Sequence, residues 1–253
     1  MILKEIKRRP TAFVVTCLLV IIGVSLGQWQ LRRAAYKENL AAQIEAKEKS
    51  APLQLGSELL TLDQAEFHPL TATGRYLKDK AIWLDNRPHP RGRDPKTGIA
   101  TGFILMMPFM LKDQPNTVIW VNRGWAPRDF QDLKKVPDIK TPIGEVSISG
   151  VGFRHAGKTY QLGSREQMTA TDGAAIAEDF ELARYESQFP RQQGFVLRQS
   201  DLQMKDGLDR DWPRMDSGAD KHYGYAFQWF ALSLMSIVFW FVTALRARAK
   251  SLR

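Results

Sequence analysis

Two uncharged apolar runs lie near the ends of the chain, and most of the polar residues lie between them. One run covers residues 11–27 and the other covers residues 223–245. At about 1.5 Å of rise per residue, helices over these runs would be about 25 and 35 Å long, close to the ~30 Å hydrocarbon core of a bilayer. The pattern predicts two transmembrane helices, at 11–29 and 222–245, the first anchored at the interface by Trp29.

The charges outside these runs predict how the chain crosses the bilayer. The tail 1–10 has a net charge of +3 and the tail 246–253 has a net charge of +4, whereas the whole chain carries +9. Basic flanks stay in the cytoplasm, so both tails are expected there and residues 30–221 are expected to be exported. The basic excess belongs to these flanks of the lipid bilayer, and no nucleic-acid partner is expected.

A cleaved signal peptide is the alternative interpretation of the first run, because Ser25-Leu26-Gly27 resembles a small-x-small cleavage site. The run is longer than the usual apolar region of a signal peptide, and bulky Trp29 follows at once, so we expect the helix to be retained. No Arg- and Ser-rich amphipathic leader precedes it. This favours a bacterial inner membrane over an organelle, with the main domain in the periplasm.

The region between the apolar runs changes from helix-prone to mainly β-prone sequence along its length. Residues 30–49 are rich in strong helix formers and are expected to continue the first helix until Pro52 stops it. One later helix is expected at 174–188, where Ile176, Phe180 and Ala183 recur at i, i+4 and i+7. Short β-prone runs bounded by turn residues predict strands at 69–77, 81–85, 102–111, 117–123, 145–154 and 194–199.

The predicted fold class is therefore a membrane protein in which two transmembrane helices flank a β-rich α+β extracytoplasmic domain. The expected division is a basic tail, a membrane helix, the exported domain, a second membrane helix and a second basic tail. Their bounds are 1–10, 11–29, 30–221, 222–245 and 246–253.

The usual signatures of enzymes and metal sites are scarce in the exported region. Neither HExxH nor GxGxxG occurs, and the single Cys17 excludes a disulfide framework and a CxxC motif. Met106, Met107 and Met110 are soft ligands that suit Cu(I), but they lie in an apolar strand-like run, which favours core packing. We therefore expect a protein that is not an enzyme.

The start of the second apolar run carries the most informative chemistry. At about 100° per residue, one stripe of this helix holds His222, Tyr225, Ala226, Trp229, Ser233, Ser236 and Trp240. The opposite side, with Phe227, Leu234 and Val238, is expected to face lipid. Imidazole is a good iron ligand, and haem sites add aromatic walls. A haem site is one interpretation; interfacial anchoring by His222 and helix packing by the small residues is the other.

Small and basic residues of the first helix complement this stripe. Gly23 and Gly27 have a small-xxx-small spacing that permits close approach of a second helix. That helix is either the other membrane helix of this chain or one from a partner, including a second copy. The alternative is a plain lack of bulk at the end of the helix, with no packing role. Arg32 and Arg33 are candidates for pairing with haem propionates, with lipid headgroups as the alternative. In the 121–127 turn, Gly124 is expected to hold a backbone conformation that a Cβ would resist.

The chain resembles the surfeit locus protein one family, also called the Shy family, of cytochrome c oxidase assembly factors. The resemblance extends over nearly the whole chain but weakens at 159–190. Four segments carry it: GQWQLRR at 27–33, followed by Tyr36-Lys37 where the family usually has Trp-Lys; Gly102 to Pro108; VNRGWAP at 121–127; and His222, Tyr225 and Trp229.

The resemblance implies a membrane chaperone that supports insertion of haem a into oxidase subunit I, alongside the machinery that synthesises haem a. It implies His222 as the haem contact and iron ligand, helped by Trp229. Tyr225, Arg32 and Arg33 complete the candidate set of cofactor-binding residues. The alternative is a membrane scaffold for oxidase assembly that does not touch haem.

Overall fold

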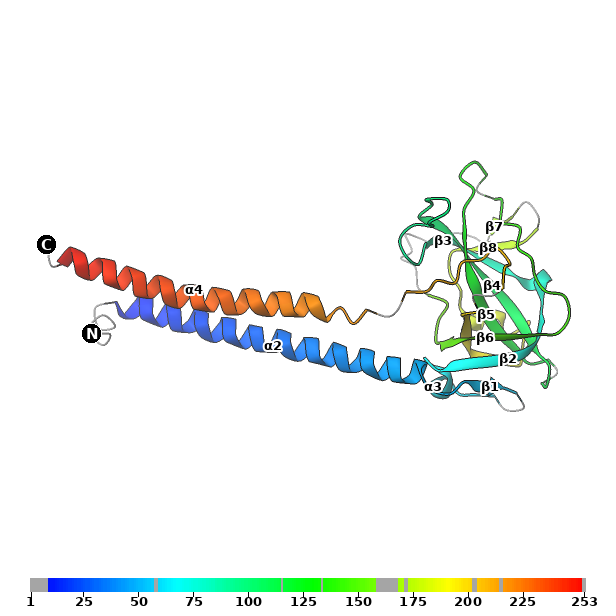
Figure 1. Cartoon of the computed structure of the whole chain (residues 1–253), viewed down its shortest axis with the longest axis horizontal. Helices are drawn as coiled ribbons and strands as arrows, with labels where there is room; N and C mark the ends of the chain where they lie inside the picture. The colour runs from blue at the N-terminus through cyan, green and yellow to red at the C-terminus, as the bar shows by residue number, and fades with distance from the viewer. Residues whose placement is uncertain are drawn as a thin grey trace. The chain divides into compact units, whose positions relative to one another are not determined.

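The computed structural model describes residues 9–56, 59–114, 116–132, 134–157, 168–170, 173–201, 204–213 and 216–251. The chain forms two compact units (Figure 1): residues 1–43 together with 215–253, and residues 44–214. Most of the basic tail expected at 1–10, the last two residues of the tail at 246–253, and part of the 159–190 region lie outside the described residues.

The first unit is built on two long helices, α2 (Pro10–Glu48) and α4 (Ala219–Ser251). Each is long and apolar enough to cross a membrane. Residues 30–48 continue α2 without a break, as their composition predicts, and the hydroxyl of Ser50 donates to the carbonyl of Lys47 at its end. Two apolar helices at the ends of the chain flank a β-rich domain, which confirms the predicted fold class.

The two helices lie side by side and antiparallel (Figure 1). The ring of Phe13 near the start of α2 lies 5.6 Å from the ring of Trp240 in the second half of α4. Buried and half-buried positions recur with alternating steps of three and four residues, which is the seven-residue repeat of coiled-coil packing. In α2 these are Phe13, Thr16, Val20, Gly23, Gly27, Gln30, Ala34, Lys37 and Ala41; in α4 they are Ala219, His222, Ala226, Trp229, Ser233, Ser236, Trp240 and Thr243.

The described part of the second unit contains nine strands in the order β1-β2-β6-β9-β5-β4-β3-β8-β7. Strand β2 also pairs with β4, so β2, β6, β9, β5 and β4 form a closed ring. Among the five pairs of this ring, β5–β9 is parallel and the other four are antiparallel, the even number of antiparallel pairs that a closed ring requires. The strands are β1 (Leu53–Leu55), β2 (Pro69–Tyr76), β3 (Ile82–Pro88), β4 (Thr101–Leu111), β5 (Val118–Pro127), β6 (Val146–Phe153), β7 (Met168–Thr169), β8 (Ala175–Ala177) and β9 (Gln192–Gln199). All six runs predicted as strands are therefore strands.

Strand β5 separates two apolar cores. Ile119 and Val121 belong to the main core, together with side chains from all the other ring strands. Trp120 points to the other side, into a smaller core with Phe180 and Val196. Because both faces are covered, β5 reads in the sequence as a continuous apolar run.

The helix predicted at 174–188 is wrong. Residues 175–177 form β8, which pairs in parallel with β3, and only a short 3₁₀ helix, η2 (Leu182–Tyr185), follows. The apolar residues serve different cores: Ile176 belongs to the main core, whereas Phe180 packs edge-on against Trp120 at 4.8 Å. One helix face cannot deliver side chains to both sides of a sheet, so the helical spacing is coincidental.

Short helical turns complete the second unit. Helix α3 (Leu62–Ala65) starts with a capping box in which Thr61 and Gln64 satisfy each other's backbone N–H groups. The 3₁₀ helix η1 (Lys78–Lys80) links β2 to β3.

Candidate functional site

The most distinctive polar contact of the helix pair joins His222 to Gln30. His222 Nδ1 lies 2.7 Å from Gln30 Oε1, and both side chains are half-buried. Both occupy positions of the seven-residue repeat, so the contact lies between the helices. We call this pair the polar seam. The sequence singled out His222 but not Gln30; the position of Gln30 in the repeat places it on the face of α2 that meets another helix, but does not tell which residue it meets.

Contacts on one side of the polar seam fix the orientation of the two helices. Tyr223 donates its hydroxyl to the carboxylate of Glu38 at 3.0 Å. Deeper in the pair, Phe230 covers Gly27 on the same side, since a Cβ on Gly27 would lie 2.7 Å from two ring carbons. This side is closed by direct helix-to-helix contact.

The other side of the polar seam holds most of the predicted cofactor-binding residues. At about 100° per residue, Arg33 and Tyr225 each lie about 60° from the seam on this side, and both are exposed. Half-buried Trp229 lies about two turns beyond His222 on nearly the same line of α4. Trp29 is also on this side and 52% exposed. We call Trp29, Arg33, Tyr225 and Trp229, together with the polar seam, the aromatic face.

Arg32 does not join this face. It lies about 200° from Gln30 around α2, on the side turned away from α4, and is exposed. The guanidinium of Arg33, in contrast, lies over the ring of Tyr36 at 5.3 Å. The structure thus separates two neighbouring arginines that the sequence treats alike.

The glycines of α2 allow the helices to approach closely. A Cβ on Gly23 would overlap the hydroxyl of Ser233 and lie 3.0 Å from the carbonyl oxygen of Trp229. The predicted packing of Gly23 against the small stripe is correct. At Gly27, however, the three nearest atoms to such a Cβ all belong to the ring of Phe230.

The expected lipid-facing side of α4 is exposed. Phe227, Leu234 and Val238 are 74%, 62% and 51% exposed, whereas Ala226 and Ser233 are buried. The hydroxyl of Ser233 donates to the carbonyl of Trp229 within the helix at 3.0 Å. The hydroxyl of Ser233 is therefore satisfied within α4, as lipid requires of a polar group.

The β unit contains a buried charged cluster around Asp206. Arg123 and Arg210 both donate to Asp206 Oδ2, Arg123 from 2.7 Å. All three residues are at most 4% exposed. The second terminal nitrogen of Arg123 donates to the hydroxyl of Thr141 at 2.7 Å, and its guanidinium lies over the ring of Tyr76 at 4.5 Å. The cluster thus buries two cations with one anion.

Burial governs the protonation of this cluster. It lowers the pKa of Arg123, while Tyr76 and Asp206 oppose that change. Burial also raises the pKa of Tyr76 to about 12, against the opposing effect of Arg123. Tyr76 is therefore neutral at physiological pH and donates its proton to Gln199 Oε1 at 3.0 Å.

Arg123 reaches this cluster because β5 contains a bulge. The register shifts so that Leu105 faces Gly124 and Met106 faces Asn122, which leaves Arg123 as the extra residue. Gly124 has φ +142°, and a Cβ there would lie 2.8 Å from the carbonyl oxygen of Asp209. The predicted conformational role of Gly124 is confirmed.

The imidazole of His89 acquires a carboxylate partner that sequence spacing did not reveal. Its Nε2 donates to Asp209 Oδ2 at 2.9 Å, while Nδ1 accepts from the backbone N–H of Arg91 at 3.1 Å. The side chain is buried edge-on against Trp125. Because both ring nitrogens are occupied, His89 has no lone pair left to act as a general base. The pair locks the loop at 89–91 to the segment around Asp209.

The three methionines considered for copper do not converge. Met107 belongs to the main core and Met106 to the smaller core on the other side of the sheet. Met110 Sδ lies 3.6 Å from a terminal nitrogen of Arg75. Among the described residues, no group of three His, Cys, Asp or Glu side chains is arranged to hold a metal ion.

The letters of two catalytic motifs occur in the chain without the structure that such motifs need. GxSxG at 23–27 lies inside α2, whereas a nucleophile elbow requires a strand-to-helix turn. GxxxxGKT at 152–159 has the letters of a P-loop. However, Gly152 and Phe153 are the last residues of β6 and pair with β9, and β6 runs antiparallel to both of its neighbours, β2 and β9. Lys158 and Thr159 lie outside the described residues.

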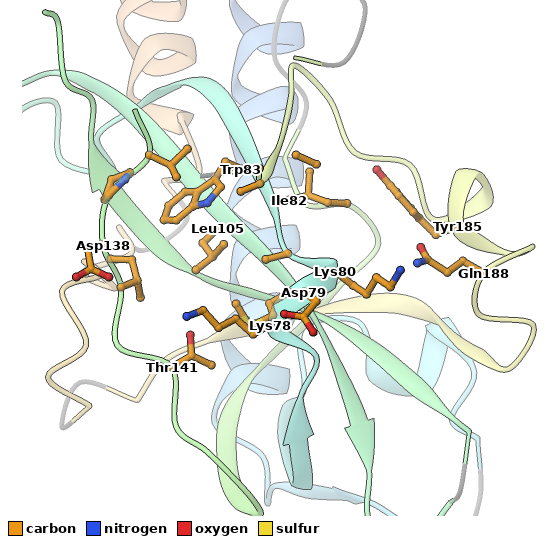
Figure 2. Close-up of a pocket in the computed structure, with 18 residues that line it drawn as sticks. Lys78, Asp79, Lys80, Ile82, Trp83, Leu105, Asp138, Thr141, Tyr185 and Gln188 are labelled. Atoms are coloured by element: carbon orange, nitrogen blue, oxygen red, sulfur yellow. The ribbon is translucent and has the colours of Figure 1, made fainter. Parts of the chain in front are cut away.

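A cleft of about 730 Å³ opens in the β unit. Figure 2 shows Lys78 and Thr141 at one part of its rim and Lys80 near Gln188 at another. Trp83 and Leu105 contribute to its lining. Asp79 and Asp138 also line it, so its charges have both signs and do not select a class of ligand.

Comparison with known proteins shows which sequences this chain resembles. A family model described as the SURF1 family matches residues 17–234. The chain is 30% identical over 172 residues to a SURF1-like protein of Drosophila melanogaster, covering 59% of this chain and 55% of that protein. It is 28% identical over 148 residues to Surfeit locus protein 1 of Homo sapiens, covering 54% and 47%.

Another relative is matched over more of its length. The chain is 25% identical over 253 residues to a SURF1-like protein of Caenorhabditis briggsae, covering 88% of this chain and 72% of that protein. The matches to Drosophila melanogaster, Xenopus tropicalis and Rattus norvegicus proteins span 55%, 44% and 42% of those proteins. The chain thus spans about half the length of these curated relatives.

Proposed function

The chain belongs to the SURF1 family, and from that premise we propose that it is a cytochrome c oxidase assembly factor that binds haem a and assists its insertion into oxidase subunit I. The proposal assigns no reaction to the chain. It describes a protein that holds a cofactor at the membrane surface and passes it on.

The arrangement of the aromatic face is the observation that carries this proposal. It brings an imidazole, an arginine and aromatic rings to the open side of the helix pair, at the start of the apolar run of α4. A haem needs these same groups: an axial ligand, a cationic partner for its propionates, and apolar walls. The opposite side of the pair is closed by Phe230 and by the Tyr223–Glu38 contact.

The donor set fits a haem. In this proposal His222 holds the iron, Arg33 pairs with a propionate, and Tyr225 and Trp229 cover the ring. When bound, the haem supplies the redox chemistry for which the oxidase needs it. The part of this chain is to bind, orient and shield the group until a partner accepts it.

The expected location follows from the same proposal. We place the protein in a bacterial inner membrane with both termini in the cytoplasm and the β unit in the periplasm, as the charged tails predict. Its partners would be oxidase subunit I, the haem a synthesis machinery and the lipid bilayer.

A scaffold for oxidase assembly without haem contact is the second candidate. The His222–Gln30 hydrogen bond favours it, because polar contacts between membrane helices also serve simply to hold them together. Under this interpretation the aromatic face packs against a partner helix.

The absorption spectrum of the full-length protein distinguishes the two functions. The protein is to be purified after co-expression with the enzymes of haem a synthesis. We expect a haem band that His222→Ala removes or shifts, and that Trp229→Phe weakens less because it keeps an aromatic ring. A spectrum without haem, or haem occupancy unchanged in a folded and inserted His222→Ala variant, would favour the scaffold.

A further inference from the structure

The hydrogen bond in the polar seam determines which nitrogen of His222 carries the proton. The amide oxygen of Gln30 can only accept, so the Nδ1 that lies 2.7 Å from it must donate. In a neutral imidazole the other ring nitrogen then has the lone pair. Apart from this contact, the ring of His222 makes no hydrogen bond to the described residues.

We propose that Gln30 is a positioning residue that holds the proton of His222 on Nδ1 and so presents the lone pair of Nε2 for binding to iron. This inference rests on the proposed haem contact of His222. The position of the proton on His222 is also expected in the protein without haem, and it can be measured in that form.

The surroundings of the two side chains strengthen the hold of Gln30 on the proton of His222. Both side chains are half-buried between the helices, where a hydrogen bond is stronger than in water. Metal-binding histidines commonly donate their second ring N–H to a carboxylate or carbonyl, which fixes both the tautomer and the ring orientation. The carboxylate that follows Gln30 along α2, Glu38, lies about two turns away and is already engaged by Tyr223.

The choice of an amide has a chemical consequence. A carboxylate partner would draw the proton more strongly and make the imidazole a more basic, tighter ligand. A neutral amide orients the ring with less increase in basicity. This suits a protein that must release its haem, because the ligand is placed correctly without being made as strong as it can be.

Nuclear magnetic resonance of the haem-free, full-length protein in detergent tests the inference directly. Histidine is labelled with ¹⁵N, and the His222 signals are identified by their loss in His222→Ala. We expect the proton of His222 on Nδ1 in the wild type and in Gln30→Glu, which keeps an acceptor. Gln30→Met, which has a similar length but no acceptor, should show a mixture of tautomers.

Titration with iron protoporphyrin IX gives the second readout. We expect Gln30→Met to bind it about 10-fold more weakly than the wild type, at the lower end of typical partner losses at metal sites. Gln30→Glu should bind at least as tightly as the wild type. Gln28→Met is the matched control, since Gln28 is an exposed glutamine two positions away on α2, and it should change neither readout.

The outcomes separate this inference from the proposed function. A proton on Nε2 in the wild type, or a tautomer unchanged in Gln30→Met, would overturn the role of Gln30 whatever the haem binding. Haem binding unchanged in His222→Ala, with the Gln30-dependent tautomer observed, would instead contradict the haem contact and leave Gln30 in control of the histidine proton.

Discussion

Gly27 of α2 packs directly against the ring of Phe230 of α4, so closely that a Cβ at Gly27 would lie 2.7 Å from two ring carbons. One turn deeper, Gly23 lies against Ser233 in the same way. Packing is a main drive for association of helices in lipid, so these two positions set the distance between the helices. That distance in turn determines whether His222 can reach Gln30.

Replacing Gly27 by Leu should force the two helices apart. Cysteines at positions 13 and 240, where the Phe13 and Trp240 rings now touch, should crosslink efficiently in a Cys17→Ser background. We expect the yield to fall severalfold in Gly27→Leu. Gly224→Leu is the control, because a Cβ at Gly224 meets nothing within 4 Å. Equal crosslinking from a cysteine at Phe227, on the exposed side, would contradict this packing.

The helical unit could be predicted from sequence because its signals are local and periodic. Uncharged runs give the helices, and the spacing of His222, Ala226, Trp229 and Ser233 gives the buried side of α4. Tyr225 was grouped with them but is 52% exposed, because the true repeat of seven residues leaves it on the flank. The contact of His222 with Gln30 could not be predicted, since it depends on the register between helices 192 residues apart.

In the β unit the sequence pattern predicted the strands but not how they pair. Its strands were predictable from β-branched and aromatic runs between turn residues. The closed ring was not, because it depends on the pairing of β2 with β4, which no local pattern encodes. Nor was the Asp206 cluster, since Arg123 and Asp206 are 83 residues apart. The false helix at 174–188 arose because Ile176 and Phe180, which belong to two different cores, and exposed Ala183 happened to have helical spacing.

The charge balance of the buried cluster predicts an unequal response to mutation. Asp206→Asn should lower the free energy of unfolding by about 3–5 kcal/mol, because it leaves two buried guanidinium groups without an anion. Arg210→Met should cost less, since the Arg123–Asp206 ion pair remains at 2.7 Å. Urea unfolding of the full-length protein in detergent measures both. A larger loss for Arg210→Met than for Asp206→Asn would show that the excess positive charge is not the governing feature.

Tyr76 should make the protein sensitive to strong alkali. Burial raises its pKa to about 12 from an ordinary value of 10.0. A raised native pKa contributes stability that is fully present below pH 10 and is lost as the pH rises through about 12. Two pKa units correspond to about 3 kcal/mol. The free energy of unfolding is to be measured for the wild type and for Tyr76→Phe from pH 9 to 12. Over this range the wild type should lose up to about 3 kcal/mol relative to Tyr76→Phe, which has no phenol proton to lose. A difference that stays constant over this range would refute the assignment.

The charged tails predict the topology. A reporter that is active only outside the cytoplasm, such as alkaline phosphatase, should be active when fused near residue 130 in the β unit. It should be inactive when fused after Arg253. This follows because the basic residues outside both apolar runs favour the cytoplasm. Activity after Arg253 together with none near residue 130 would invert the model.

Neighbouring arginines of α2 should differ in their effect on haem binding. Arg33 lies on the aromatic face about 60° from Gln30, whereas Arg32 lies about 200° away. Arg33→Ala is therefore expected to weaken binding of iron protoporphyrin IX by up to about fivefold, since an exposed ion pair contributes ~0–1 kcal/mol. Arg32→Ala removes the same charge at nearly the same depth and should have no effect. Titration of the two variants at the same ionic strength measures the contrast, because salt screens both a direct exposed ion pair and the general surface potential. Equal losses in the two variants would mean that the arginines act through the general positive potential of the membrane surface, and the assignment of Arg33 to a propionate would fail.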